Sequence, residues 1–321
     1  MINVYLVGRL GNQLFTYAMA EALRQRRGGH EKIVCYCDQI TNMNWEITLK
    51  NYNIPNVEFV HGVKRPLGMT IQSVISSRFR RFFVKHKNLL DTRFYELCQR
   101  FLNSVGIVME MGRYVDMRTP HTRNVLVKGG FQSVRYFEDV QPLIRKNLGV
   151  HVAELMQKDY VQKLLNSNSV CISVKVEHNA DNPLFDVCSP EYYEEALTYI
   201  KEHVEDPLFF VCSDNVQYVL NHYVDASKYE CICQEKGLPV NDSLAIMGLC
   251  KHFVMGNSSF AWWAQYMSEN PDKIVVAPNR WLRTSKSQGG GNAYAQNWHY
   301  VDVTGYIART AEKYKNMEWS M

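Results

Sequence analysis

The sequence predicts a mixed α/β protein of two domains, each built on a parallel sheet covered by helices. Short apolar strands alternate with amphipathic helices along the chain, a pattern typical of parallel sheets with helical crossovers. The alternation stops in a polar stretch over residues 150–168 and then begins again. At 321 residues, the chain is long enough for two domains of about 150 residues each. We therefore expect one domain over residues 1–150 and a second over residues 151–321.

The elements of the first domain are predicted from hydrophobic periodicity and from glycine positions. Apolar residues recur at helical spacing after Gln13, and the pair Gly28-Gly29 ends that helix. The expected order is a strand over 2–7, a loop over 8–12, a helix over 13–27, a strand over 33–37, a helix over 77–101, a strand over 125–130 and a helix over 138–148. A strand, a helix and a second strand in this order begin a parallel sheet.

The second domain repeats this alternation. Pro190 suits the first turn of a helix, where the backbone N–H that proline lacks is not needed. The predicted strands cover 170–174, 208–212, 253–255 and 274–276, and the predicted helices cover 190–204, 242–249 and 258–268. The stretch from Gly289 to Gly291 is expected to form a mobile loop. These lengths predict a second doubly wound domain.

Composition and charge restrict the class of partner. Hydrophobic residues make up 46% of the chain and charged residues 21%, which indicates a folded protein. The net charge of +4 suits an anionic small ligand or a membrane surface and is too small to indicate nucleic acid. No run of about 18 apolar residues occurs, so no membrane-spanning helix is predicted. The first residues lack the basic and apolar parts of a signal peptide, so we expect a cytoplasmic protein.

The nine cysteines predict reduced thiols. Their number is odd, and no two of them form a C-x-x-C pair. Two C-x-C pairs, Cys35 with Cys37 and Cys231 with Cys233, lie within strand-like runs. We therefore expect neither disulfides nor a zinc site.

The predicted helix over residues 77–101 leaves two interpretations open. Eight large apolar residues are expected to line one face, and four basic residues lie off it. The apolar residues are Phe79, Phe82, Phe83, Leu89, Leu90, Phe94, Leu97 and Phe101, and the basic residues are Arg80, Arg81, Lys85 and Lys87. The helix either belongs to the core, with a solvated basic edge, or rests on anionic lipid.

Three loops that follow predicted strands carry residues suited to holding ligands, because ligands of doubly wound sheets bind beyond the carboxyl ends of the strands. The loop Gly8–Gln13 leaves amides at a helix N-terminus, and either meets a ligand or is a tight turn. Asp214 either accepts hydrogen bonds from a ribose or a guanine, or caps the next helix. The loop Gly256–Ser259 presents amides and hydroxyls to an anion, while Trp262 and Trp263 either pack in the core or stack on substrate.

Six segments resemble, in order, the signature motifs of the α-1,2-fucosyltransferases, glycosyltransferase family 11. They are G-R-L-G-N-Q-L-F-T-Y-A at 8–18, G-F-Q-S-V-R-Y-F at 130–137, C-S-P-E-Y-Y at 188–193, F-V-C-S-D-N at 210–215, D-S-L at 242–244 together with N-S-S-F-A-W-W at 257–263, and K-I-V-V-A-P-N-R-W at 273–281. The first segment and the 242–281 segments are the most specific. The resemblance covers residues 4–281, which is most of the chain.

One family motif, H-x-R-R-x-D, is degenerate here. The matching residues run from Ser173 to His178 as S-V-K-V-E-H, so Lys175 and Val176 replace the two arginines. In related fucosyltransferases the arginines stabilise the departing diphosphate, and the histidine helps to hold guanine. A lysine keeps the charge but loses the bidentate geometry, and losing such contacts costs about 2–4 kcal/mol of barrier. Three outcomes stay open: Lys175 suffices with Arg9 as a second cation, the donor or acceptor differs, or the protein binds nucleotide without transferring sugar.

The resemblance implies the GT-B fold, in which two Rossmann-like domains face a cleft. Residues 1–150 would hold the acceptor and residues 151–321 the GDP-sugar. It also implies inverting transfer of fucose from GDP-fucose to the 2-OH of a galactoside in a bacterial surface glycan, without a cofactor or divalent metal. The sequence agrees in having no D-x-D pair. The acceptor would be a glycan or lipid-linked oligosaccharide, and the enzyme would be cytoplasmic, with peripheral contact to an anionic membrane on its inner face. The alternative is an impaired relative that binds nucleotide or glycan, or uses another donor or acceptor.

Carried over to this chain, the resemblance assigns the following site. The catalytic candidates are Lys175, Glu177 and His178, and the donor-binding candidates are Arg9, Gly11, Asn12, Gln13, Ser173, Asp214, Asn257, Ser258, Ser259 and Phe260. Lys175 and the helix start at 258–260 would meet phosphate, and Asp214 would meet guanosine. Glu177 and His178 are the options for a general base, although either side chain could simply face solvent.

Overall fold

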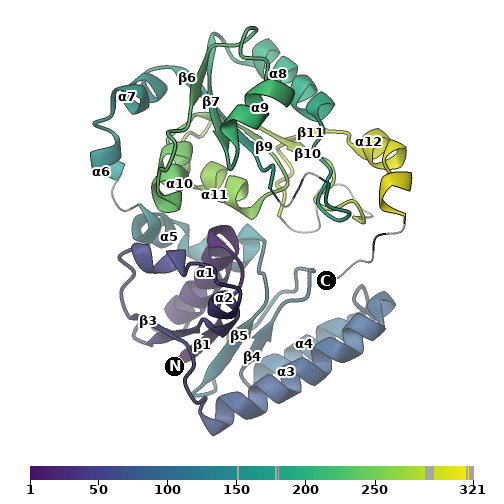
Figure 1. Cartoon of the computed structure of the whole chain (residues 1–321). Helices are drawn as coiled ribbons and strands as arrows, with labels where there is room; N and C mark the ends of the chain where they lie inside the picture. Colours follow the sequence, from purple (N-terminus) through teal and green to yellow (C-terminus); the bar gives the residue numbers. More distant parts are fainter. Residues whose placement is uncertain (150–151, 178, 180, 286–292, 316, 318–321) are drawn as a thin grey trace. The chain divides into compact units, whose positions relative to one another are not determined.

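The computed structural model describes residues 1–321 except 150–151, 178, 180, 286–292, 316 and 318–321. The chain divides into two compact units, Met1–Val150 and His151–Met321. Each unit contains one parallel sheet with helices packed against it (Figure 1). The prediction of two doubly wound α/β domains, the components of a GT-B fold, is confirmed. The predicted glycine loop at 289–291 lies outside the described residues.

The sheet of the first unit has the strand order β3-β2-β1-β5-β4, and every neighbouring pair is parallel. The strands are short and, apart from β3, largely buried. They are β1 (Ile2–Tyr5), β2 (Ile33–Tyr36), β3 (Val57–Val60), β4 (Ile107–Met109) and β5 (Val125–Lys128). The predictions for β1, β2 and β5 are confirmed, whereas β3 and β4 had no prediction.

Helices cover this sheet on both faces. The first, α1, packs against β1, β2 and β5, and Met69 of α3 packs against Val34, Tyr36 and Leu126 in the sheet. The helices of the unit are α1 (Leu10–Arg26), α2 (Asp38–Asn42), α3 (Leu67–Lys85), α4 (Arg93–Ser104) and α5 (Gln141–Leu148). The helix α1 begins at Leu10, three residues before the predicted start. Residues 10–12 therefore lie in its first turn instead of a loop.

The prediction of one helix over 77–101 is wrong. Two helices, α3 and α4, are separated by a short 3-10 turn over Lys87–Leu89. The break lets the chain fold back, so that Phe83 of α3 packs against Tyr95 of α4 with ring centroids 5.0 Å apart. The predicted single apolar face is consequently divided: Phe83 is buried, whereas Leu97 and Phe101 are about 60% exposed.

A buried ion pair supports α1. Glu21 is fully buried, and its carboxylate lies 2.6 Å from the guanidinium of Arg24, which also donates to the carbonyl of Pro55. Tyr17 donates to Glu21 and accepts a hydrogen bond of 2.8 Å from Asn147 at the end of α5. Because both charges are out of water, each depends on the other for compensation.

The second unit contains a six-stranded parallel sheet of order β11-β10-β9-β6-β7-β8. The strands β6 and β7 are the longest, and both are almost wholly buried. The strands are β6 (Asn168–Val174), β7 (Pro207–Ser213), β8 (Cys231–Cys233), β9 (His252–Met255), β10 (Val275–Pro278) and β11 (His299–Val301). The four predicted strands are confirmed as β6, β7, β9 and β10. The edge strand β8 coincides with the strand-like run at Cys231 and Cys233, and the edge strand β11 had no prediction.

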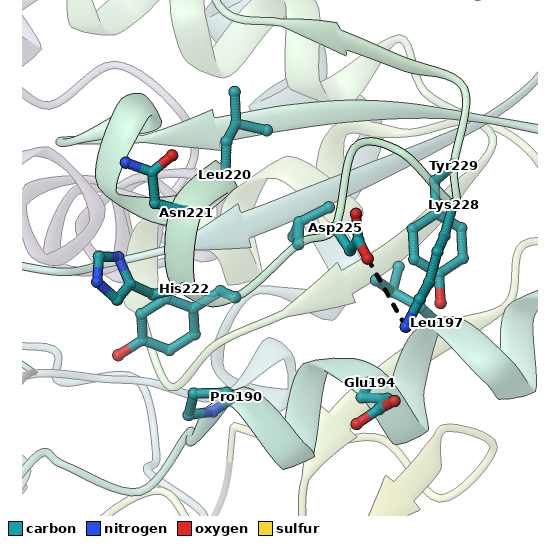
Figure 2. Close-up of a pocket in the computed structure, with 11 residues that line it drawn as sticks. Pro190, Glu194, Leu197, Leu220, Asn221, His222, Asp225, Lys228 and Tyr229 are labelled. Carbon is teal, nitrogen blue, oxygen red and sulfur yellow. Dashed lines mark ion pairs between the residues drawn. The ribbon is translucent and has the colours of Figure 1, made fainter.

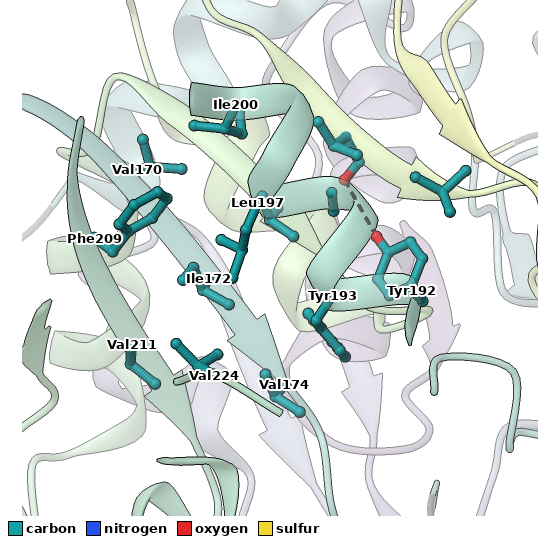
Figure 3. Packing of buried hydrophobic residues seen from close by; sticks show 14 of the residues in the cluster. Val170, Ile172, Val174, Tyr192, Tyr193, Leu197, Ile200, Phe209, Val211 and Val224 are labelled. Carbon is teal, nitrogen blue, oxygen red and sulfur yellow. Dashed lines mark hydrogen bonds between the residues drawn. The ribbon is translucent and has the colours of Figure 1, made fainter. Parts of the chain in front are cut away.

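One core cluster joins α8 to the middle of this sheet. Leu197 and Ile200 of α8 pack with Ile172 of β6 and with Phe209 and Val211 of β7 (Figure 3). The helices of the unit are α6 (Val152–Leu155), α7 (Asp159–Leu165), α8 (Pro190–His203), α9 (Val216–His222), α10 (Val240–Gly248), α11 (Ser259–Met267) and α12 (Thr304–Arg309). The predictions for α8, α10 and α11 are confirmed to within two residues at each end.

Two further sequence expectations concern cysteines and membrane helices. All nine cysteines are free thiols, as predicted, and Cys35, Cys231 and Cys233 lie in strands. Within the described parts of the chain, no helix combines the length and the apolar character that crossing a membrane requires.

Substituting Arg24 tests the buried pair. Arg24→Met would leave the carboxylate of Glu21 buried without its counter-charge, and such losses typically cost about 3–5 kcal/mol of unfolding free energy. Urea denaturation followed by circular dichroism measures the change. The matched control is Lys32→Met, which removes a pair with Glu58 whose side chains are 56% and 47% exposed. The control should change stability by less than about 1 kcal/mol, and an equally small effect of Arg24→Met would contradict the expectation.

Candidate functional site

Each sheet has a switch point, which is the first strand of the sheet. Strands that follow it in the sequence are added first along one of its edges and later along the other edge. In the first unit the chain runs from β1 to β2 and β3, and β5 then pairs with the opposite edge of β1. In the second unit it runs from β6 to β7 and β8, and β9 then pairs with the opposite edge of β6. Ligands of doubly wound sheets bind at such points, beyond the carboxyl ends of the strands.

The first two motifs meet at the switch point of the first unit. Gln132, in the loop after β5, donates a hydrogen bond of 2.9 Å to Oδ1 of Asn12 at the start of α1. Thr16 of α1 donates to the carbonyl of Gly129 in the same loop. Gly8 has a φ of +73°, and a Cβ there would lie 2.6 Å from the side-chain nitrogen of Asn12. Glycine is therefore needed for Asn12 to lie over the turn.

Glu110 holds the second motif in place. Its Oε2 accepts hydrogen bonds from the backbone amides of Gly130 and Phe131, at 3.1 and 3.2 Å. Burial raises the pKa of Glu110 above its usual value. The hydrogen bonds from these amides favour the carboxylate and offset part of that rise. Glu110 lies directly after β4, a strand that had no prediction, so sequence reasoning did not select this residue.

The side chain of Gln13 is engaged in contacts within the protein, and its predicted contact with the donor stays a prediction. Its side chain is fully buried, and it donates to the carbonyls of Gly8 and Glu46, both at 3.0 Å. Its Oε1 accepts hydrogen bonds from Thr48 and from the amide of Leu49. All of its polar atoms are thus occupied in joining the turn at Gly8 to the loop at 46–49.

The neighbouring candidates Arg9, Gly11 and Asn12 occupy different environments. Arg9 is exposed and precedes α1, with its guanidinium 5.7 Å from the centroid of the Trp45 ring. Gly11 is buried in the first turn of α1, and Asn12 is half-buried at the switch point. Arg9 and Asn12 therefore have surface to offer a ligand, and donor contact stays a prediction for all three residues.

In the second unit, the predicted residues of three loops meet at one sheet edge. The register pairs Ser173 of β6 with Cys212 of β7 and with Met255 of β9, so the three strands end side by side. Ser173 is 9% exposed, and its carbonyl accepts a hydrogen bond of 3.1 Å from the amide of Gly256. A Cβ on Gly256 would lie 2.9 Å from the hydroxyl of Tyr193. Only glycine allows the turn after β9 to approach β6 this closely.

The motif at 188–193 positions these strand ends. Ser189 caps α8 by accepting from the amide of Tyr192 at 3.3 Å. The Tyr192 hydroxyl donates to the carbonyl of Met255 at 2.6 Å, and the Tyr193 hydroxyl donates to that of Ser173 at 3.2 Å. Burial raises the pKa of both phenols, which keeps them protonated as donors. The two tyrosines thus hold the ends of β9 and β6, a role that sequence reasoning did not assign.

Asp214 holds the backbone that follows Lys175. Its carboxylate accepts from the amide of Val176 at 2.8 Å and from the amide of Glu177 at 3.2 Å. The side chain is exposed and its oxygens have further lone pairs, so binding of guanosine stays a prediction. It does not cap α9, because Asn215 performs that role.

Asn257 joins three loops and has no polar atom to spare. Its side chain is 4% exposed, and its nitrogen donates to the carbonyls of Phe185 and Trp281 at 3.0 and 2.8 Å. Its oxygen accepts from Asn179 at 3.0 Å. The structure therefore gives the Asn257 side chain a role in positioning these loops, and its predicted contact with the donor stays a prediction.

The turn after Asn257 leads into α11. Ser258 is the N-cap residue, and its Oγ accepts from the amide of Phe260 at 3.3 Å. Ser258, Ser259 and Phe260 are all half-buried at the edge of the sheet. Amides in the first turn of a helix have no partner within that helix and carry partial positive charge. The charge and amides at this end of α11 suit an anion, and contact with the diphosphate stays a prediction.

Lys175 lies at the end of β6, half-buried, and lines a small cavity together with Asp186, Cys188, Tyr193 and Asn257. Of the described residues around this cavity, Lys175 is the single cation and Asp186 the single carboxylate. The next two candidates differ from it. Glu177 is exposed, and His178 lies outside the described residues. Val176, at a position where the family has arginine, packs against the core cluster of the unit.

Asp186 ties the C-terminal helices to this cavity. It is 6% exposed and accepts from Tyr306 of α12 at 3.0 Å and from Tyr314. The backbone carbonyl of Asp186 also accepts from Arg283 at 2.9 Å. Sequence reasoning missed Asp186, since it lies in no motif and its partners follow it by about 120 residues, a separation that no local pattern reveals.

A second pocket lies between α8, the end of α9 and the loop before β8 (Figure 2). Its lining includes Glu194 of α8 and an ion pair between Asp225 and Lys228, whose charged atoms are 3.7 Å apart. Tyr223 lines both this pocket and the Lys175 cavity. The two hollows therefore share one aromatic side chain.

With this geometry established, comparison with known proteins identifies the family. The profile of glycosyl transferase family 11 matches residues 95–302, more than half of the chain. This chain belongs to glycosyl transferase family 11. The predicted family and the predicted class of enzyme, a glycosyltransferase, are confirmed, whereas the donor, the acceptor and the individual site residues stay predictions.

Two relatives from Escherichia coli align with most of this family 11 chain. The O-antigen biosynthesis glycosyltransferase WbnK is 23% identical over 306 residues, which cover 86% of this chain and 93% of the relative. An alpha-1,2-colitosyltransferase is 24% identical over 282 residues, which cover 86% of this chain and 91% of the relative.

Solved structures of two other glycosyltransferases align with this family 11 chain at lower identity. The fucosyltransferase NodZ from Bradyrhizobium is 13% identical, with a TM-score of 0.47, and the match covers 85% of this chain and 94% of NodZ. A family 9 glycosyltransferase from Veillonella parvula is 12% identical, with a TM-score of 0.45, and the match covers 99% of this chain and 90% of that protein.

Substituting Asp186 tests its link to the cavity. Asp186→Asn weakens the hydrogen bonds to two phenols, so we expect a loss of about 1–3 kcal/mol of stability and weaker binding of GDP. Thermal denaturation and calorimetric titration with GDP measure the two effects. The matched control is Asp181→Asn, because Asp181 is 78% exposed on the same loop and pairs with Lys313 at the surface. If both variants bind GDP and melt like the wild type, Asp186 does not position the site.

Proposed function

We propose that this protein is an inverting glycosyltransferase that transfers fucose from GDP-fucose to the 2-OH of a galactoside in a bacterial surface glycan. Membership of family 11 supports the reaction class. The observation that carries the proposal is the position of Lys175 and the start of α11 on neighbouring strand ends, β6 and β9, at the switch point of the second unit. One ammonium and a set of helix amides suit a diphosphate.

In this proposal the second unit binds the GDP-sugar and the first unit binds the acceptor. Lys175 and the first amides of α11 meet the diphosphate, and Asp214 meets the guanosine. As the acceptor hydroxyl attacks the anomeric carbon, negative charge develops on the departing diphosphate. These donors stabilise that charge, so neither a divalent metal nor a cofactor is required. Glu177 and His178 are the proposed candidates for the base that receives the proton.

The relatives support a surface glycan as the product. One is named for O-antigen biosynthesis and the other for α-1,2 transfer of colitose. Because one of these relatives is named for the transfer of colitose, a colitosyl donor belongs in the same assay panel as GDP-fucose. The proposed acceptor is a glycan or a lipid-linked oligosaccharide. A lipid-linked acceptor would bring the enzyme to a membrane, so peripheral contact with an anionic membrane belongs to the same proposal.

Release of GDP tests the reaction. Incubation with GDP-fucose and a panel of galactosides should release GDP and yield a product in which the anomeric configuration of the sugar is inverted. Chelation of divalent metals should leave the rate unchanged. The reaction would be wrong if none of the GDP-sugars, including a colitosyl donor, turned over with any acceptor.

Substitution of Lys175 tests whether its ammonium stabilises the departing diphosphate. Lys175→Ala should lower kcat by about 10²–10³, because the charge that develops on the diphosphate loses its one side-chain cation in the described cavity. Lys175→Arg should retain or raise the rate, since arginine restores the bidentate geometry. Lys236→Ala, at an exposed site in the same unit, is the control. An unchanged kcat for Lys175→Ala would remove Lys175 from the mechanism.

A second candidate function is supported by Val176. Because this side chain packs against the core, the second arginine of the family motif has no direct counterpart here. We therefore retain a non-catalytic protein that binds a nucleotide or glycan as the alternative. Calorimetry that shows GDP binding, with no turnover by either the wild type or Lys175→Arg, would favour it. Val176→Arg is a poor test, because it would disturb the core.

A further inference from the structure

The helices α3 and α4 expose large apolar side chains to an unusual degree. The described residues include fourteen exposed large hydrophobic side chains, and eight of these lie on the two helices. They are Leu67, Ile71, Val74, Phe82, Val84, Phe94, Leu97 and Phe101. Leu67 is 77% exposed and Phe101 is 62% exposed. Contiguous apolar surface of this kind marks an interaction site far more often than isolated apolar residues do.

These side chains form stripes with helical spacing. On α4, Phe94, Leu97 and Phe101 are three and four residues apart, so they lie on one face. The opposite face of α4 contains Tyr95 and Leu102, both buried. One face of this helix therefore packs in the core, and a second apolar face is exposed on the surface.

The stripe on α3 has the same character. Leu67, Ile71 and Val74 lie one helical turn apart on its outward face, whereas Met69 and Phe83 are buried on the inward face. The stripes of the two helices adjoin at Phe82 and Phe94, which are each almost half exposed and have ring centroids 6.4 Å apart. We call the outward faces of α3 and α4 the α3–α4 surface.

Positive charge is concentrated in the same segment. Residues 64–104 contain nine Lys and Arg but only two acidic residues, which gives this segment a net charge of +7. The whole chain has a net charge of +4, so the rest of the chain has a net charge of −3. Arg78, Arg81 and Lys85 continue the outward stripe of α3, and all three are exposed. Arg93 and Arg100 are exposed beside the apolar stripe of α4. The surface is thus apolar and basic together.

We propose that the α3–α4 surface docks on an anionic lipid membrane. Helices that lie in the plane of a membrane combine an aromatic and aliphatic face with lysine and arginine, and anionic headgroups complement the charge. If a second copy of this chain docked here, two segments that each have a net charge of +7 would face each other. Their electrostatic repulsion opposes self-association through this surface. The inference deepens the proposed function and rests on it in one respect, the lipid-linked acceptor that docking would bring within reach.

Sedimentation with vesicles tests the docking. The full chain should sediment with vesicles that contain phosphatidylglycerol and stay in the supernatant with pure phosphatidylcholine, in a buffer of about 50 mM salt. Binding should fall at about 500 mM salt, where charges are screened over a few ångströms. Recovery of the wild type in the supernatant with phosphatidylglycerol vesicles at low salt would overturn the proposal.

Two sets of substitutions locate the contact. The apolar variant carries Phe94→Ser, Leu97→Ser and Phe101→Ser, and the basic variant carries Arg78→Glu, Arg81→Glu and Lys85→Glu. Each set should weaken vesicle binding by about 10²-fold or more. Each basic residue near such a surface contributes about fivefold, and the apolar set removes the side chains that would enter the membrane. All six side chains are exposed, so both variants should keep the wild-type melting temperature. That measurement confirms that each variant is folded.

A matched control removes equal charge elsewhere. Lys163→Glu, Lys228→Glu and Lys236→Glu together change the charge by the same amount on exposed sites of the second unit, and should leave vesicle binding nearly unchanged. An equal loss in this control would show that net charge, and not the α3–α4 surface, drives binding. A wild-type dimer that the apolar variant converts to a monomer would overturn the proposal in favour of a second copy as occupant.

Turnover with a soluble galactoside separates this inference from the proposed function. If both hold, the apolar and basic variants should match the wild type with a soluble acceptor. Vesicle binding without turnover by any form of the protein would contradict the proposed function and leave the docking surface standing. Turnover without vesicle binding would overturn the docking surface, and the membrane contact with it, and would leave the transfer reaction standing.

Discussion

The close approach of two backbone segments organises the second unit. The turn after β9 passes so near the end of β6 that Gly256 donates to the carbonyl of Ser173, and no side chain fits at position 256. Tyr192 and Tyr193 fix the two strand ends from α8 through their hydroxyls. As a result, Lys175 and the start of α11 are held at one edge of the sheet. The proposed chemistry depends on this approach, because in that proposal the diphosphate is neutralised by Lys175 and the first amides of α11 without a metal ion.

The first unit follows the same design with different residues. Gly8 with its positive φ, and the hydrogen bond from Gln132 to Asn12, join the loops after β1 and β5 at the switch point. In both units, motifs that are far apart in the sequence meet where the strand order reverses. This is a consequence of doubly wound topology, since adjacent strands there belong to separate parts of the chain.

Much of the fold could be predicted from the sequence, because apolar runs and helical periodicity are local. Buried strands such as β6 and β7 gave clear signals, whereas the short strands β3, β4 and β11 did not. The helix predicted over 77–101 failed for a physical reason. Its apolar periodicity was real, but the pairing of Phe83 with Tyr95 across a turn depends on tertiary packing that no local pattern specifies.

The site was predictable in outline and less so in detail. Motifs identified loops that meet at the strand ends of each sheet, yet they did not distinguish residues with free surface from residues that position the loops. The side chains of Gln13 and Asn257 are buried with their polar atoms hydrogen-bonded inside the protein, so in the structure both support loops. Glu110 supports the loop at 130–131, and Asp186 ties its own loop to α12, although neither residue belongs to a motif. Only three-dimensional contacts reveal such residues, because their partners are distant in sequence or are backbone amides.

The most direct measurement of the central claim is a crystal structure of this protein with GDP bound. We expect the diphosphate between the ammonium of Lys175 and the first amides of α11, with the guanosine toward Asp214 and no metal ion beside the phosphates. A diphosphate bound away from the ends of β6 and β9, or a Lys175 side chain that points into solvent, would contradict the account.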